Sequence, residues 1–377
     1  MIHFVHIQMF LTFSAFLGAR VLFSLFALDS GASPLQVGVL AAGSQLAPVL
    51  LAFHAGRLVD RLGSRRPLVV AAMCGMAGIL LPYLLPGMPA LFAGSVLLGI
   101  WTTGCVLVSQ ALLRTLSEPA RLANNLAVYG TYGALTMLVG PPLAGFAIDH
   151  VGHLNACLWL LPFPLAVLLM LAYWGAGLPP GTRSREAPAK LLDTLADRHL
   201  WWVIAVSGAV QLAMELFPFY LPIYAHGIGL SASAIGLVLA CLPLSTLVVR
   251  PLMPRLLARF GDMPLLGYSF ALAALAFAMV PLFRDPVLLG LVAALFGLGI
   301  ACGQPLTLLL LMKRAAKDRV AEAMGLRVTA TGILRLVAPS LFGGLAASLG
   351  MAAVFAVTGA LLFGCAWATL HPAKESK

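Results

Sequence analysis

The stretch Gly56-Arg57-Leu58-Val59-Asp60-Arg61-Leu62-Gly63 is a short basic turn between two long apolar runs, and it occurs twice in the chain. The second copy, Pro254-Arg255-Leu256-Leu257-Ala258-Arg259-Phe260-Gly261, lies 198 positions later. The same offset pairs Ser33 with Ser231, Gly38 with Gly236, Arg121 with Arg319, Pro141 with Pro339 and Gly145 with Gly343. An apolar chain with such a repeat is predicted to be a membrane protein built from two similar halves.

The composition excludes a soluble globular protein. Hydrophobic residues make up 61% of the chain and charged residues 10%, whereas a soluble domain has about 25% charged residues. The mean hydropathy is +0.99. The net charge of +10 does not indicate nucleic acid as a partner, because the basic residues separate apolar runs instead of forming a face. The six cysteines lie in apolar stretches without metal-ligand spacing, so we expect packing residues and no metal site.

The fold is predicted to be an all-α membrane protein with twelve transmembrane helices in two six-helix, parallel-repeat bundles. Each span needs about 20 apolar residues, and backbone groups in lipid must form their hydrogen bonds within the chain. Residues 1–178 are predicted to form the first bundle, 179–199 a hydrophilic cytoplasmic linker and 200–377 the second bundle. The predicted spans are 4–28, 35–56, 67–86, 90–112, 125–148, 154–177, 200–224, 232–253, 264–283, 287–311, 322–347 and 350–370.

The basic residues predict the orientation in the membrane. With a cytoplasmic N-terminus, nearly all of them fall on the cytoplasmic side, as the positive-inside rule requires. Only Arg284 lies clearly outside. An even number of spans returns the C-terminus to the cytoplasm. We therefore expect a multi-pass protein of the cell (inner) membrane with both termini inside.

The first basic turn resembles the signature loop of the major facilitator superfamily. The pattern that carries the resemblance is Gly56-x-Leu58-x-Asp60-Arg61-x-Gly63-x-Arg65-Arg66. The resemblance covers essentially the whole chain, because the repeat and the expected helix count agree with it. It implies that this gating loop latches the two halves in the outward-facing state, with Asp60 as its acidic residue. The second copy has Ala258 at the matching position, which predicts a weaker latch there.

A second motif, Gly140-Pro141-Pro142-Leu143-Ala144-Gly145, lies on the fifth span. It partly resembles the glycine–proline motif of antiporter members of that family. Small residues such as Gly140 and Gly145 allow close helix packing, and Pro141 removes a backbone donor and bends a helix. The motif is therefore either an antiport marker or a kinked packing helix.

Three ionisable residues are predicted to lie deep within spans: Arg20 on span one, Glu215 on span seven and Arg335 on span eleven. Intramembrane charges are costly and mark functional sites by default. The repeat places Arg20 level with Pro218, about 4.5 Å along the helix axis from Glu215. We therefore expect Arg20 and Glu215 to meet in a central cavity, either as substrate and proton site or as a structural ion pair. If Arg335 also faces that cavity, it favours an anionic or zwitterionic substrate, and if it faces the packing region of spans five and eleven, it is structural.

Two glutamines extend this candidate site. Gln211 lies one turn before Glu215 on the same helix face, and Gln304 lies between Gly303 and Pro305, where span ten is predicted to break. Pro218 and Pro222 are predicted to kink or unwind the outer end of span seven.

The predicted function is secondary active transport, with no enzymatic activity and no cofactor. No catalytic or nucleotide-binding motif such as HExxH, GxSxG or a Walker sequence is present. We expect a monomer in the lipid bilayer that exports a small amphipathic or anionic compound by alternating access, coupled to protons. The alternative is proton-coupled uptake of a small organic anion, which Arg20 and Arg335 favour. Glu215 is the expected proton carrier, as the acidic residue well inside a span.

Overall fold

The computed structural model describes residues 2–51, 63–118, 121–178, 198–314 and 320–371, and every element in these ranges is a helix. Gly56, Asp60 and Arg61 of the gating loop lie outside the described residues, as does nearly all of the predicted linker. Ten of the described helices are long and apolar enough to cross a membrane, and Pro34–Leu50 is a shorter apolar helix. The count of twelve spans stays a prediction.

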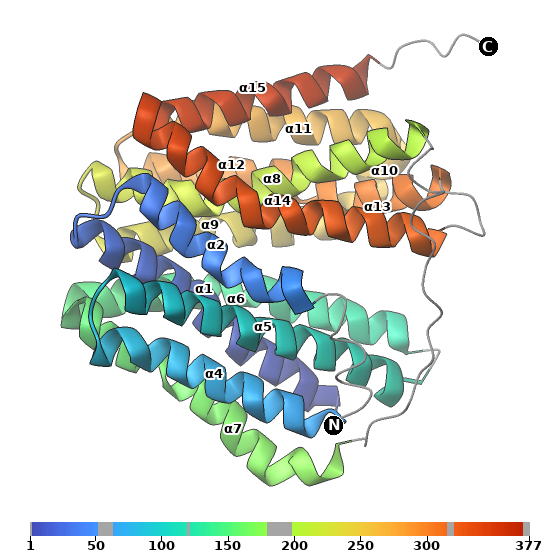
Figure 1. Cartoon of the computed structure of the whole chain (residues 1–377). Helices are drawn as coiled ribbons and strands as arrows, with labels where there is room; N and C mark the ends of the chain where they lie inside the picture. Colours follow the sequence, from blue (N-terminus) through green and yellow to red (C-terminus); the bar gives the residue numbers. More distant parts are fainter. Residues whose placement is uncertain (1, 52–62, 119–120, 179–197, 315–319, 372–377) are drawn as a thin grey trace. The chain divides into compact units, whose positions relative to one another are not determined.

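The helices group into two compact units (Figure 1). The first unit comprises Met1–Glu186 and Gly229–Ala240, and the second comprises Ala187–Ile228 and Cys241–Lys377. The helices of the first unit are α1 (Ile2–Asp29), α2 (Pro34–Leu51), α4 (Arg65–Leu84), α5 (Met88–Leu116), α6 (Leu122–Leu160) and α7 (Pro162–Trp174), followed by the 3-10 turn η1 (Gly175–Gly177).

The second unit begins with α8 (Arg198–Gly227) and takes the second half of α9 (Ala232–Val249), whose first nine residues belong to the first unit. The remaining helices are α10 (Met253–Phe260), α11 (Asp262–Met279), α12 (Pro286–Ile300), α13 (Gly303–Arg314), α14 (Val320–Leu349) and α15 (Met351–Leu370), with 3-10 turns η3 (Arg250–Leu252) and η4 (Val280–Leu282).

The repeat seen in the sequence recurs in the turns. Three pairs of glycines 198 positions apart have left-handed backbone conformations, with φ of 84° and 86° at Gly31 and Gly229, 72° and 79° at Gly63 and Gly261, and 76° and 84° at Gly152 and Gly350. Residues other than glycine rarely adopt such backbone angles. Both halves therefore place glycine turns at corresponding positions, and at Gly152 this turn kinks α6 between two helical segments.

Close helix crossings also recur. A Cβ atom on Gly99 of α5 would collide with the backbone of Ser44 on α2, and one on Gly297 of α12 would collide with Leu242 on α9. Gly99 matches Gly297, and Ser44 matches Leu242, at the repeat offset. Because small residues allow backbones to approach in membranes, the repeat preserves the same scaffold contact in each half.

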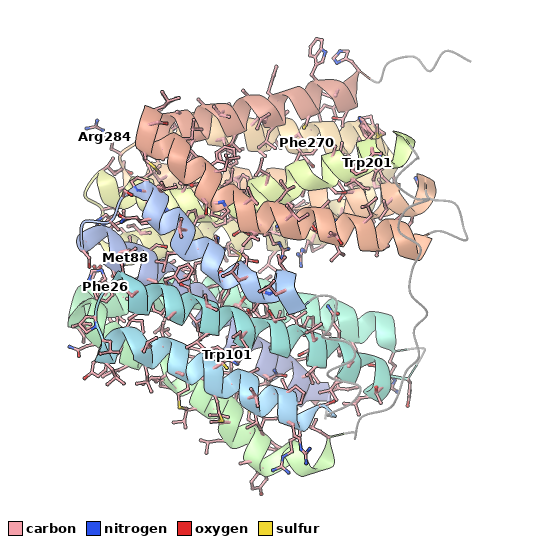
Figure 2. The ribbon with its side chains drawn as sticks, in the orientation of Figure 1. Phe26, Met88, Trp101, Trp201, Phe270 and Arg284 are labelled. Atoms are coloured by element: carbon pink, nitrogen blue, oxygen red, sulfur yellow. The ribbon has the colours of Figure 1, made fainter. Side chains whose placement is uncertain are left out.

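Aromatic side chains fill the interior of each unit. In the first unit Trp101, with 1% of its surface exposed, lies against Gly75 of α4 (Figure 2). In the second unit Phe217 and Phe296 stack with ring centroids 4.0 Å apart, and Phe277 meets both edge-on. These contacts fix α8 against α11 and α12, so the polar face of α8 is held in a defined direction.

The predicted unwinding at Pro218 and Pro222 is wrong, because α8 runs as one helix from Arg198 to Gly227, while a kink there stays a prediction. Two tyrosine hydroxyls near these prolines bond α8 to neighbouring segments. The Tyr220 hydroxyl donates to the carbonyl of Pro339 at 2.6 Å, and that of Tyr224 donates to the carbonyl of Phe283 at 3.0 Å.

Candidate functional site

Span ten is interrupted, and this interruption positions the first polar residue of the site. Helix α12 ends at Ile300 and α13 begins at Gly303, directly before Gln304. Gly303 lies against Val210 of α8, since a Cβ atom there would stand 3.0 Å from a Val210 methyl group. The start of α13 is therefore held close to α8, and Gln304 is one residue into the new helix.

The polar face of α8 meets Gln304 at Gln211. The Gln304 side-chain nitrogen donates to Oε1 of Gln211 at 3.1 Å and contacts the Met214 sulfur at 3.5 Å. Gln211 is 4% exposed and Glu215, one turn further along α8, is 7% exposed. Buried polar groups of this kind need partners, and the Gln211–Gln304 pair supplies one to each side chain.

Two arginines on α14 extend this pair into a chain. Nη2 of Arg335 donates to Oε1 of Gln211 at 3.1 Å. Nη2 of Arg327 donates to Oε1 of Gln304 at 3.4 Å and to the Thr307 hydroxyl at 3.2 Å. We call these five residues, Gln211, Gln304, Thr307, Arg327 and Arg335, the cationic chain.

The electrostatics of the cationic chain favour a negatively charged ligand. Arg327 and Arg335 lie eight residues apart on α14, about 12 Å along the helix axis, and their charges repel. The hydrogen-bond acceptors within the cationic chain are amide and hydroxyl oxygens, which carry no formal charge. Each guanidinium has five N–H donors in a planar fork that suits carboxylates and phosphates, and Arg335 is exposed. The cationic chain therefore carries a net positive charge, and Arg335 has further N–H donors that a ligand can use.

Of the predicted site residues, the structure brings Gln211, Gln304 and Arg335 together in the second unit. Glu215 lies on the same helix as Gln211, one turn away. Arg20 lies in the first unit, half-buried on α1, beside a small pocket lined by Ser24, Ser44 and Ser95 with room for about one water molecule. Because Arg20 and Glu215 belong to different units, their meeting stays a prediction.

Sequence reasoning missed Arg327 and Thr307. Arg327 lies near the cytoplasmic end of its predicted span, where an arginine can extend to the membrane surface. The repeat carries a signal that could have found both: Arg327 matches Tyr129 and Thr307 matches Ser109, so both positions carry polar side chains in each half.

The described part of the gating loop comprises Gly63 and Arg65. Gly63 has a φ of 72°, and Arg65 begins α4 and lies against Gly175 of η1, where a Cβ atom would stand 3.0 Å from its Nε. The second copy of the loop forms the short helix α10, which ends at Phe260 and is followed by Gly261.

The helix-packing motif lies at two crossings of α6. Gly140 lies against the backbone of Ser14 and Gly18 on α1, while Gly145 lies against Ala232 at the start of α9. The backbone of Pro141 approaches Gly236, where a Cβ atom would stand 2.7 Å from the Pro141 carbonyl oxygen. These residues therefore allow backbone-to-backbone contact between neighbouring helices.

Comparisons with known proteins agree with this architecture. The family model of the Major Facilitator Superfamily matches residues 7–339 and 228–377. A D-xylose-proton symporter-like protein, chloroplastic, from Arabidopsis thaliana is 27% identical over 149 residues, which cover 39% of this chain and 26% of that relative.

Solved structures share the fold at low sequence identity. A peptide transporter POT in complex with sulfate is 15% identical, with a TM-score of 0.78 over 98% of this chain and 93% of the other. A POT family transporter in complex with 5-aminolevulinic acid is 13% identical, with a TM-score of 0.79 over 98% and 95% of the two chains. The nucleoside transporter NupG is 14% identical, with a TM-score of 0.77 over 98% of both chains. The predicted family, its helical transporter fold and the non-enzymatic class are confirmed.

Proposed function

Since the chain belongs to the Major Facilitator Superfamily, we propose that it is a proton-coupled secondary transporter that exports a small amphipathic or anionic compound by alternating access. The observation that carries this proposal is the cationic chain, in which Gln211 and Gln304 hold Arg327 and Arg335 near one another. Two like charges held together gain most from a ligand of opposite charge. The substrate is accordingly a compound with a carboxylate, phosphonate or similar group.

The proton-coupling part of the proposal rests on Glu215. This carboxyl group is 7% exposed and lies on α8, one turn from Gln211. A buried carboxyl that shares a helix face with the ligand-binding amide can respond to the ligand by changing its protonation. In this scheme the anion binds at Arg335 and Gln211, and Glu215 carries the proton.

The orientation follows from the distribution of basic residues. In this orientation the chain spans the inner membrane with both termini in the cytoplasm. The loops that follow even-numbered spans then lie in the cytoplasm, and they carry most of the arginines and lysines. In this arrangement Arg284 is outside, and the ion pair of Lys313 with Asp262, at 2.7 Å, is at the cytoplasmic surface.

The test is transport by purified protein in liposomes under imposed pH gradients of either sign. The probes are small monocarboxylates, phosphonates and, as the uncharged arm, D-xylose. We expect flux of at least one anion to follow the proton gradient and to vanish with a protonophore. Gradient-driven movement of D-xylose with no movement of any anion would overturn the anion assignment.

Uptake of a small organic anion is the second candidate. It is favoured by the similarity to a symporter-like protein, although the match covers 26% of that relative. Overexpression in cells separates the two directions, because an exporter lowers the cellular level of its substrate and an importer raises it.

A further inference from the structure

The side-chain oxygens of the cationic chain are already occupied. Oε1 of Gln211 accepts hydrogen bonds from both Gln304 and Arg335, and Oε1 of Gln304 accepts one from Arg327. The Thr307 hydroxyl accepts from Arg327 and donates its own proton to the Gln304 backbone carbonyl at 3.0 Å. Each side-chain oxygen of the cluster therefore has a donor from within the cluster.

Several donors of the cationic chain, in contrast, are unused. Nε of Arg327 is buried and has no hydrogen-bond partner among the described residues. The amide nitrogen of Gln211 bonds to no described residue either, although this side chain is buried. Arg335 is exposed and donates through Nη2, which leaves its Nε and Nη1 for a ligand. A buried donor without a partner is destabilising unless a ligand or a water molecule supplies an acceptor.

The two arginines also lack a compensating negative charge. Neither Arg327 nor Arg335 forms an ion pair with a carboxylate of the part of the chain that the structure describes. Their Cα atoms are about 12 Å apart along the axis of α14 and about 80° apart around it. Their bonds to the paired amides of Gln211 and Gln304 bring the two guanidinium groups closer together than this rise. The two cations therefore lie at the two ends of one short row of hydrogen-bonded groups.

The repeat shows that helix packing does not require the unused donors. In the first half the positions of Gln211 and Arg335 are occupied by Phe13 and Met137, neither of which donates a side-chain hydrogen bond. The same arrangement of helices is thus built without these groups. We therefore assign them to a ligand.

We propose that the ligand of the cationic chain is a short dicarboxylate, with one carboxylate bound by Arg335 and the Gln211 amide nitrogen and the other bound by Arg327. An ionised carboxylate only accepts hydrogen bonds, so it matches a cluster whose unused groups are donors. Two carboxylates also compensate two buried or half-buried cations, whereas one leaves a cation uncompensated. This inference rests on the proposed transport of an anionic compound and narrows its substrate to one chemical class.

The separation of the two arginines limits the length of the ligand. The guanidinium groups are less than about 12 Å apart, and a hydrogen bond of about 3 Å at each end leaves at most about 6 Å between the carboxylates. At about 1.5 Å per carbon–carbon bond, this span corresponds to a dicarboxylate of about four to six carbons.

The test is calorimetry on the full-length protein in detergent at pH 7.5, where both carboxyl groups of the probe are ionised. The probes are glutarate and its monoamide, which have nearly the same size but differ by one charge. We expect glutarate to bind about 10- to 100-fold more tightly than the monoamide, because it makes additional hydrogen bonds between charged groups. Malonate and suberate, which are shorter and longer, should both bind more weakly than glutarate.

Two results in the wild type would overturn this inference, and neither needs a variant to fold. The first is equal affinity for glutarate and its monoamide. The second is an affinity that rises steadily with chain length up to suberate, because burial of apolar surface would then explain binding. Binding of neither glutarate nor its monoamide would overturn the proposed anion transport as well, whereas equal binding of the two leaves that proposal intact.

Variants separate the two ends of the site. In Arg327→Tyr and in Arg335→Gln, the affinities for glutarate and its monoamide should come within about twofold of each other, because one charged hydrogen-bond partner is lost. Met137→Gln, in the first half, should keep the wild-type ratio of the two affinities. An unchanged ratio in Arg327→Tyr would show that Arg327 does not bind the second carboxylate and would contradict the proposal.

Discussion

The two halves differ in side-chain charge at matched positions of the repeat. The first unit has Ser109 and Tyr129 at two positions whose counterparts in the second unit, Thr307 and Arg327, form a hydrogen bond of 3.2 Å. The hydroxyl partner is kept, while a neutral phenol is exchanged for a cation. The duplication thus kept a hydroxyl side chain at one position and changed the charge at the other in one half.

The polar residues around these positions also differ in charge between the two halves. In the first unit the Gln8 amide donates to the Cys105 sulfur at 3.0 Å and accepts from the Ser109 hydroxyl at 3.4 Å. This group is buried and neutral, so its hydrogen bonds are satisfied internally. In the second unit Arg335 replaces Met137 of the first and brings a charge that amide oxygens alone do not neutralise. The comparison predicts that ligand binding depends on the second half and that both halves share the scaffold.

The largest expected effect comes from Glu215, whose counterpart in the first half is Leu17. Glu215→Gln should lower proton-driven flux by more than about 100-fold, because proton transfer by a positioned side chain contributes on that order. Exchange of labelled for unlabelled anion without a pH gradient should persist. Proton-driven flux at the wild-type rate in liposomes would remove Glu215 from the mechanism.

Arg335→Gln should weaken anion binding about 10- to 100-fold, because a hydrogen bond to a charged group is worth about 1.5–3 kcal/mol. The matched control is Met137→Gln at the equivalent position of the first half, which should leave the affinity within about twofold of wild type, as expected away from the binding groups. The measurement is the dissociation constant of the best anion by calorimetry. Equal losses in both variants would contradict the assignment of binding to the second half.

Arg327→Tyr gives the second half the residue of the first and tests the comparison directly. The variant keeps a hydroxyl partner for Thr307 but removes a cation, so anion affinity should fall about tenfold. Tyr129→Phe in the first half should change it little. A thermal-shift titration with the same anion measures both, and an unaltered affinity in Arg327→Tyr would limit Arg327 to a structural role.

The smallest effects are expected for substitutions of the scaffold glycines that both halves share. Gly99→Ala and Gly297→Ala each place a Cβ atom against a neighbouring backbone, and overpacking of this kind costs about 1–3 kcal/mol. Gly130→Ala and Gly332→Ala, which have open space around them, should be neutral or stabilising by up to about 1 kcal/mol. Unfolding midpoints in detergent test this pattern. A large difference between Gly99→Ala and Gly297→Ala would break the equivalence of the two scaffolds.

The fold was predictable because the repeat and the length of the apolar runs can be read directly from the sequence. The offset of 198 positions set the two halves, and apolar runs of membrane length set the helices. The continuous course of α8 was not predictable from Pro218 and Pro222, because its tyrosines bond to Pro339 and Phe283, which are distant in the sequence.

The candidate site was predictable in part. Depth and helix spacing pointed to Gln211, Gln304 and Arg335, which the structure brings together. Arg327 was missed because an arginine near a helix end usually extends to the surface, and its contact with Gln304 depends on the tertiary packing of α13 against α14. The Arg20–Glu215 pair stays a prediction.

The most direct test of the central claim, that the cationic chain binds an anion, compares a carboxylate with its uncharged amide analogue on purified protein. Calorimetry should show binding of the carboxylate and none of the amide to the wild type, with the carboxylate affinity lost in Arg335→Gln and kept in Tyr129→Phe. Equal binding of the carboxylate and the amide, or wild-type affinity in Arg335→Gln, would contradict the account.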